Sequence, residues 1–273
     1  VKNKIEACEG QVYLNTTVCG FKRNGNRVES VVVSRDGQEQ IVPGTDFISS
    51  MPVTEFIRKL DPPPPDEVVE AARKLTYRDF LTVCLIVDKP DLFADNWIYI
   101  HDPNVTVGRI QNFKNWSPYM VPDQSKTSLG MEYFCNEGDE VWSAPDEQLV
   151  EMARRELAQI GLANYEDVLD GCVFRVEKSY PVYTSDYAQY LGVIRNYIDT
   201  LENFQTIGRN GLHRYNNQDH AMLTGMLAVR NMLFGENNDL WVVNAEQEYH
   251  VEIREVQESG QAVQEAVEEA FPH

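Results

Sequence analysis

The chain of 273 residues contains no uninterrupted apolar run of about 20 residues, the length that a bilayer-spanning helix needs. Its five cysteines form no C-x-x-C pair, and neither H-E-x-x-H nor G-x-S-x-G occurs. These absences argue against a membrane span, a zinc site, a disulfide framework and a serine-hydrolase elbow, and they predict no metal. The cysteines are therefore expected to be reduced thiols in a cytoplasmic protein.

Positive charge is also scarce, with 24 lysines and arginines against 43 aspartates and glutamates and a formal net charge of −19. Nucleic acids and anionic membrane surfaces need a basic footprint, so both are excluded as general partners. A small-molecule substrate is expected instead, and a homodimer stays open. The chain begins at Val1 with neither a signal peptide nor an initiator methionine, which predicts a fragment that starts inside a longer protein.

What is present is an ordinary globular composition, 42% hydrophobic and 25% charged, long enough for one large domain or two smaller ones. Apolar patterns predict strands at 11–19, 28–34, 38–42, 46–52, 80–87, 97–100, 106–112, 127–134, 172–176 and 204–207. Helical periodicity predicts helices at 66–75, 143–160, 185–201 and 217–234. The mixture predicts an α/β (mixed α+β) fold with helices flanking one main sheet, a boundary or connector at prolines 62–65, and a loose or disordered tail after 255.

The segment from Gly208 to His220 is the most informative part of the sequence. A strand is expected to end at Gly208, a glycine-containing loop follows, and a helix starts near Asn217. Such a turn presents free backbone N–H groups and the positive end of a helix dipole to a ligand. Positive potential is expected to gather here from Arg209, His213, Arg214 and His220. An anionic or electron-rich ligand therefore fits this segment, although Asn217 and Asp219 could instead be simple helix caps.

The pattern Gly208-Arg209-x-Gly211-x-x-Arg214-Tyr215-Asn216-Asn217-x-Asp219-His220 resembles the C-terminal FAD motif of UDP-galactopyranose mutase and its amine-oxidase-like relatives. Val12-x-Leu-x-x-x-Val18, a meander and Phe47 to Pro52 are similar to the middle FAD segment of that superfamily. Tyr180-Pro-Val-Tyr183, followed by a tyrosine-rich helix, resembles the stretch before the final motif in the mutase-like branch. The resemblance covers residues 12 to 234.

This resemblance implies the C-terminal portion of a two-domain flavoprotein. Residues 1–59 and 183–240 would belong to the FAD-binding domain, residues 60–182 would bind the substrate, and 241–273 would be a tail. Val18 would lie against the adenine, and Gly208 and Arg209 would approach the ribityl and pyrophosphate groups. The remaining implied cofactor contacts are Ser50, Met51, Tyr215, Asn217, Gln218 and Asp219. The final helix would aim its N-terminus at the flavin, where its dipole stabilises negative charge on the reduced cofactor.

One departure from the family pattern affects the cofactor prediction. The strand, G-x-G-x-x-G loop and helix with which such enzymes bind the pyrophosphate are absent from the sequence. The chain alone is therefore expected to be inactive and to bind FAD weakly or not at all. Stoichiometric flavin absorbance in the purified chain would refute this expectation.

Candidate substrate contacts are Arg109, Arg175 and Tyr183. Arg109 and Lys114 could hold a phosphate and Trp116 could stack on a ring, although this segment could instead be a strand and loop with a solvated edge. The favoured hypothesis is an FAD-dependent oxidoreductase of the mutase-like branch that acts on a nucleotide sugar or related small molecule. The alternatives are an amine or polyene oxidase of the same superfamily, and a binding module without catalysis. An apolar tunnel would favour a polyene, whereas arginines and tyrosines near the flavin would favour a nucleotide sugar.

Overall fold

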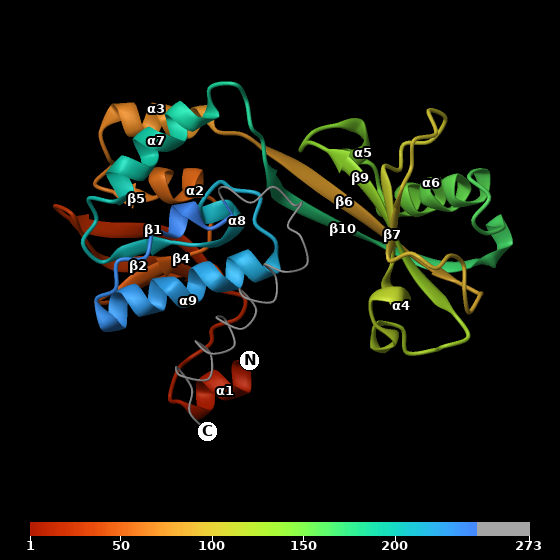
Figure 1. Cartoon of the computed structure of the whole chain (residues 1–273), viewed down its shortest axis with the longest axis horizontal. Coiled ribbons are helices and arrows are strands. Elements are labelled where there is room, and N and C mark those ends of the chain that lie inside the picture. The colour runs from red at the N-terminus through yellow and green to blue at the C-terminus, as the bar shows by residue number, and fades with distance from the viewer. Residues whose placement is uncertain (245–273) are drawn as a thin grey trace, which may run out of the picture.

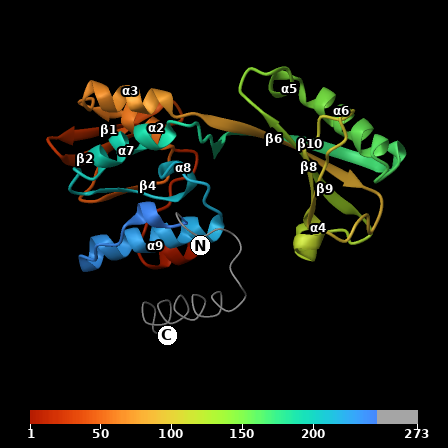
Figure 2. The same cartoon turned by 45° about the horizontal axis from the view of Figure 1, so that its top comes forward.

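The structure is a computed structural model that describes residues 1–244, and its elements fall into two groups joined by two long strands (Figure 1). Strands β6 (Tyr77–Val87) and β10 (Val168–Pro181) leave the first group side by side and run into the second (Figures 1 and 2). The fold is a mixed arrangement of helices and strands, as predicted. It is built on two sheets and a separate strand pair, so the prediction of one main sheet was wrong.

The first group contains a four-stranded sheet of order β3-β2-β1-β5 and a parallel pair of β4 and β11. The strands are β1 (Thr17–Asn24), β2 (Arg27–Arg35), β3 (Gln38–Pro43), β4 (Phe47–Ser49), β5 (Leu60–Asp61) and β11 (Phe204–Thr206). The helices are α2 (Val53–Arg58), α3 (Asp66–Lys74), α7 (Tyr187–Ile198), α8 (Gly208–Gly211) and α9 (Gln218–Phe234), with α1 (Lys2–Ala7) at the start of the chain. Their shared core includes the stacked rings of Phe56 and Phe204, whose centroids lie 3.8 Å apart.

The second group is an antiparallel sheet of order β10-β6-β9-β8-β7. Its other strands are β7 (Trp97–Tyr99), β8 (Arg109–Asn112) and β9 (Thr127–Cys135), and its helices are α4 (Phe113–Trp116), α5 (Glu140–Ser143) and α6 (Asp146–Gln159). Leu149, Ala153 and Leu157 of α6 are buried in one core with Leu81 and Leu85 of β6. Because side chains alternate along a strand, the opposite face of this sheet carries the other residues of each strand, and we call it the open face.

Several predicted boundaries were wrong for local reasons. Residues 11–16 are not a strand, because Asn15 adopts a left-handed φ of +54° and Tyr13 and Leu14 point into solvent. The helix expected over 143–160 starts later, at Asp146 after Pro145, and Ser143 instead ends the short helix α5. The predicted tail lies, from residue 245 onward, outside the described residues.

The proline run 62–65 does not separate the two groups. It links β5 to α3, and Val68, Ala72 and Leu75 beyond it are buried in the same core as Phe56. The chain passes to the second group only along β6. The assignment of the groups to cofactor and substrate binding stays a prediction.

Candidate functional site

The turn after β11 lies against the segment after β4. The two strands pair in parallel, Thr206 opposite Ser49, and the Ile207 N–H donates to the Ser49 carbonyl at 2.9 Å. Gly208 follows with a φ of +74°, and its N–H donates to Thr224 Oγ1 in α9 at 3.0 Å. The expected glycine loop is the short helical turn α8. Two segments far apart in the sequence, 47–52 and 204–220, thus form one unit.

Gly211 lies where these segments are closest. An ideal Cβ at this position would be 2.4 Å from Thr206 Oγ1 and 3.2 Å from the Ser49 carbonyl oxygen. We expect Gly211→Ala to lower the free energy of unfolding by about 1–3 kcal/mol, because a buried site without space must shift its backbone. Urea denaturation of the purified chain measures this loss.

Gly192 in α7 provides the matched control, because an ideal Cβ there meets no atom within 4 Å. Gly192→Ala is expected to be neutral or to stabilise the helix by up to about 1 kcal/mol. Equal effects of the two substitutions would show that Gly211 is not sterically required.

Two arginines and two tyrosines meet between the two groups, and we call Arg109, Tyr180, Arg209 and Tyr215 the Arg–Tyr cluster. The Arg209 guanidinium carbon lies 4.9 Å from the Tyr180 ring centre and 4.8 Å from that of Tyr215. The two rings are stacked at 5.4 Å. Arg109 donates to the Tyr180 hydroxyl at 3.3 Å, which links the open face to the head of α9. Cation–π contacts and hydrogen bonds therefore hold both cations in place.

Two hydrogen bonds fix the arginine and tyrosine on the α8 side of the cluster. Arg209 Nε donates to the Asn216 carbonyl at 2.8 Å, and the Tyr215 N–H donates to the hydroxyl of Tyr183 at 2.7 Å. Burial raises the pKa of Tyr215 and of Tyr183 above the usual range, so both phenols are neutral near pH 7. The cluster thus keeps a positive charge surrounded by aromatic rings.

Arg109 also forms an ion pair with Glu132, and both side chains are mostly buried, at 14% and 6% exposure. Burial raises the pKa of Glu132, and the Arg109 guanidinium opposes the increase. Gln111 donates a further hydrogen bond to the Glu132 carboxylate at 3.1 Å. The ion pair therefore places a positive and a negative charge, which neutralise each other, on the open face.

The open face carries two rows of side chains that follow from the strand register. The first row, from β10 to β7, is Phe174, Thr82, Glu132, Arg109 and Tyr99. The second is Cys172, Cys84, Gly130, Gln111 and Trp97. Trp97 stacks on Trp116 at 5.3 Å, and the Trp116 indole N–H donates to Gln111 at 2.8 Å. Tyr99 and Phe174 are each 58% exposed, so the face can contact a ligand.

The head of α9 is capped by its own side chains. Asn217 and His220 form a reciprocal capping box, in which the Asn217 N–H donates to His220 Nδ1 at 3.3 Å. The expectation that this turn offers its first N–H groups freely is therefore only partly met. Gln218 and Asp219 are exposed beside the cap.

Buried polar atoms without partners lie next to this cap. Asn216 is 2% exposed, yet both its side-chain amide atoms lack a hydrogen-bond partner among residues 1–244, as does Asn210 Oδ1. Buried amides are nearly always hydrogen-bonded, so these atoms mark a place where a further polar group fits.

His213 does not add positive charge, contrary to the expectation. It is 1% exposed and packs against Tyr77, Tyr183 and Tyr187, with ring centroids 4.8–6.5 Å apart. Burial lowers the pKa of His213 to about 4, and the nearby Val182 backbone opposes this only in part. The imidazole is thus neutral near pH 7, and the charge of the segment comes from its arginines.

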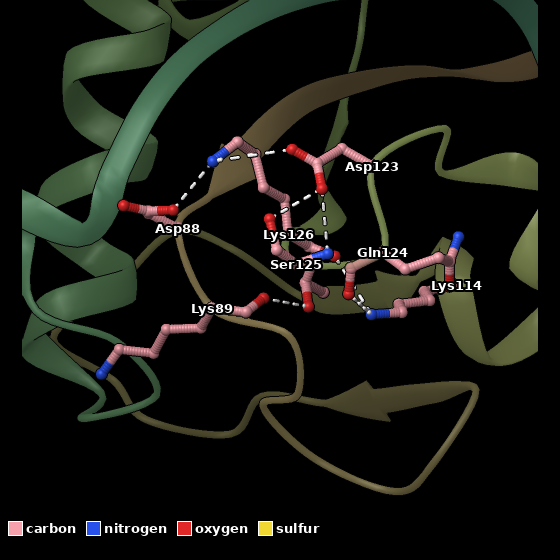
Figure 3. Close-up of polar contacts among 8 residues, drawn as sticks. Asp88, Lys89, Lys114, Asp123, Gln124, Ser125 and Lys126 are labelled. Atoms are coloured by element: carbon pink, nitrogen blue, oxygen red, sulfur yellow. Dashed lines mark hydrogen bonds and ion pairs between the residues drawn. The ribbon is translucent and has the colours of Figure 1, made fainter.

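Two cations that were predicted to contact the substrate instead form hydrogen bonds with nearby parts of the chain. Arg175 lies on the α6 side of the sheet, where it donates to the carbonyls of Trp142 and Ala144 and to Asp146. Lys114 Nζ donates to the carbonyls of Pro90, Gln124 and Lys126, in the loop network of Figure 3. The structure does not bring either residue together with the Arg–Tyr cluster.

Of the remaining predicted residues, some lie near α8 and one lies on β1. Ser50 and Met51 follow β4 directly, and the Met51 carbonyl lies beside Gly211 of α8, the helical turn that contains Gly208 and Arg209. Val18 lies on β1, half-buried against the first core, and its carbonyl accepts a hydrogen bond from Lys59 at 3.1 Å. Sequence reasoning missed Glu132 and Tyr99, whose only sequence signal is their place in alternating strands.

The profile of the family described as flavin containing amine oxidoreductase matches residues 3–233. The chain belongs to this family. No curated protein matches the chain. Among residues 1–244, no helix is long and apolar enough to cross a membrane, and no three His, Cys, Asp or Glu side chains group as a metal site.

Several solved structures share the fold. A reduced UDP-galactopyranose mutase superposes with a TM-score of 0.74 at 21% identity, over 89% of this chain and 52% of the other. A triple variant of putrescine oxidase gives 0.57 at 16% identity, over 85% and 51%. An oxidoreductase from Methanosarcina mazei gives 0.51 at 13% identity, over 77% and 47%. The chain therefore spans about half the length of these proteins.

Proposed function

We propose that this chain is part of an FAD-dependent oxidoreductase of the mutase-like branch, whose substrate is a nucleotide sugar or a related phosphate-bearing molecule. The observation that carries this proposal is the Arg–Tyr cluster. Its two guanidinium groups come from strand β8 and from the helical turn α8, and both contact Tyr180. Guanidinium groups are suited to phosphate, and tyrosine rings offer stacking surfaces and hydroxyl donors to a sugar or base.

The residues around α8 fit an FAD molecule. Gly208 has a positive φ and little around it, the Met51 carbonyl lies beside Gly211 of the same turn, and the unpartnered amide of Asn216 can bond a polar group of the cofactor. Tyr215, Asn217, Gln218 and Asp219 surround the head of α9, whose dipole favours negative charge. When bound, the flavin supplies hydride transfer or, in a mutase, a nucleophile for a sugar carbon.

The side chains of the chain itself would bind and orient the substrate. Arg209 is held by carbonyls and two rings, so its charge is already in place before a phosphate arrives. Glu132 neutralises part of the charge of Arg109. Arg109 would therefore orient the phosphate through directed hydrogen bonds more than it would attract it by net charge. Tyr99, Trp97 and Phe174 on the open face would shield the bound molecule from water.

The alternative of a polyene oxidase has one supporting observation. Phe134, Phe174 and Val176 expose apolar surface on the open face, at 46%, 58% and 49%. A ligand screen separates the candidates, with UDP, putrescine and a soluble carotenoid fragment as probes of the flavin-loaded protein. Quenching of tryptophan fluorescence by UDP alone supports the proposal, whereas flavin reduction by putrescine or by the polyene would overturn it.

Flavin binding is tested separately. We predict that the purified chain of 273 residues carries little or no flavin, because it contains no G-x-G-x-x-G loop. A version extended upstream of Val1 is expected to bind FAD stoichiometrically, which absorbance spectra of both proteins would reveal. If neither version binds FAD, the non-catalytic binding module becomes the better account.

Arg209→Ala is expected to weaken UDP binding by the flavin-loaded, extended protein by roughly 10- to 100-fold, the value of one charge-assisted contact. Arg209→Lys should recover only part of the affinity, because lysine lacks the planar group that contacts both tyrosine rings. Arg73→Ala is the control, since this arginine pairs with Glu70 on the surface of α3. Unchanged UDP affinity in Arg209→Ala would contradict the assignment.

A further inference from the structure

Two thiols lie directly opposite each other on the open face. Cys84 of β6 and Cys172 of β10 are partners in the antiparallel register, and both are free cysteines. Directly opposite residues in such a ladder have Cα atoms about 4.5–5.5 Å apart, whichever of the two hydrogen-bonding types the pair has. Disulfides form across Cα separations of about 4.4–6.8 Å, so the backbone already meets the distance requirement.

The two thiols have different environments. β10 is the edge strand of the sheet, and Cys172 is exposed there. Cys84 lies one strand further in and is partly covered, and its other neighbour, Gly130, lies beneath the ring of Phe113. Burial raises the pKa of the Cys84 thiol to about 11, and the adjacent Cys172 side chain adds to the increase. Cys172 is therefore the more accessible thiol and the better first nucleophile.

We propose that Cys84 and Cys172 form a redox-modification site, a cross-strand dithiol that a low-molecular-weight disulfide such as oxidised glutathione converts to an intramolecular disulfide. The inference rests on the strand register alone and is independent of the proposed flavin chemistry.

The conversion proceeds by two thiol–disulfide exchanges. The Cys172 thiolate attacks one sulfur of oxidised glutathione, expels one glutathione and forms a mixed disulfide. Cys84 then loses its proton and attacks the Cys172 sulfur, which expels the second glutathione. The two cysteines are oxidised, the small disulfide is reduced to two thiols, and the two protons end on the released glutathione molecules.

The other cysteines provide the internal comparison. Cys8 is exposed and Cys19 is partly exposed, and a single accessible thiol without a partner should keep its glutathione. Cys135 is buried and should react slowly. A Cys8→Ser, Cys19→Ser background of the full chain therefore leaves the proposed pair as the accessible thiols.

The test is to incubate this background protein with oxidised glutathione, count free thiols and map the peptides by mass spectrometry. We expect loss of two of the three remaining thiols, a peptide pair joined through Cys84 and Cys172, and no retained glutathione. Adding Cys84→Ser should stop the reaction at a stable glutathione adduct on Cys172. Adding Cys172→Ser should leave Cys84 as a free thiol.

Two results would overturn the proposal. One is a lasting glutathione adduct on Cys172 while Cys84 of the same molecule stays reduced. The other is a free thiol at both positions after exhaustive incubation. Because the decisive map is made with both cysteines present, poor folding of either single variant does not obscure the outcome.

Discussion

Replacing Arg109 by methionine is expected to lower the free energy of unfolding by about 3–5 kcal/mol, the cost of leaving a buried carboxylate without its partner. Glu132 would then keep only the hydrogen bond from Gln111, in a position where its side chain is 6% exposed. Its pKa, which burial already raises, would rise further because the opposing guanidinium is gone. Chemical denaturation of the chain at pH 7 measures the loss.

A double variant distinguishes this mechanism from a simple packing defect. Arg109→Met combined with Glu132→Leu removes both charges, and its stability should return to within about 1 kcal/mol of the wild type. Arg73→Met removes an arginine from an exposed pair, 63% and 59% exposed, and should cost less than about 1 kcal/mol. A double variant less stable than Arg109→Met would show that the charges themselves stabilise the sheet.

His213 is expected to make the chain lose about 3 kcal/mol of stability as the pH falls from 6.5 to 4. The folded protein holds this imidazole at a pKa of about 4, whereas the unfolded chain has a value near 6.5. Between these values the unfolded state binds more protons, so the stabilising contribution is complete above pH 6.5 and is lost as the pH falls through 4. Burial raises the pKa values of Tyr77 and Tyr183 beside it, so these two phenols stay neutral throughout this window.

His213→Phe isolates this effect from the many carboxylates that also titrate in acid. The ring would stay among Tyr77, Tyr183 and Tyr187 but carry no titrating group. Because residue 213 has a φ of +45°, the variant will be less stable at every pH. The informative quantity is therefore the change in stability between pH 7 and pH 4, and an identical change in both proteins would refute the prediction.

Local sequence patterns predicted most strands and helices well, because periodicity and turn residues act over a few neighbours. Strands β2 and β3 and the helix from Gln218 to Phe234 are at the expected places. Failures occurred where one residue changes the local backbone, as Asn15 and Pro145 do.

The candidate site could be located only in part for a related reason. The pattern around Gly208 predicted the turn between β11 and α9, but it could not show that His213 would be buried and neutral. Arg109 and Arg175 looked equivalent in sequence. Strand alternation directs one to the open face and the other to α6, and register decides which neighbour each meets.

The sequence by itself determined the mixed fold, the family resemblance and the turn at Gly208, because these depend on residue types at short spacing. Tertiary structure decided the Arg–Tyr cluster, the buried Arg109–Glu132 pair and the opposed thiols of Cys84 and Cys172. The contacts of Arg109 with Tyr180 and Glu132 and of Cys84 with Cys172 join residues 71, 23 and 88 positions apart. Only the pairing of distant strands fixes which side chains meet and how much water they lose.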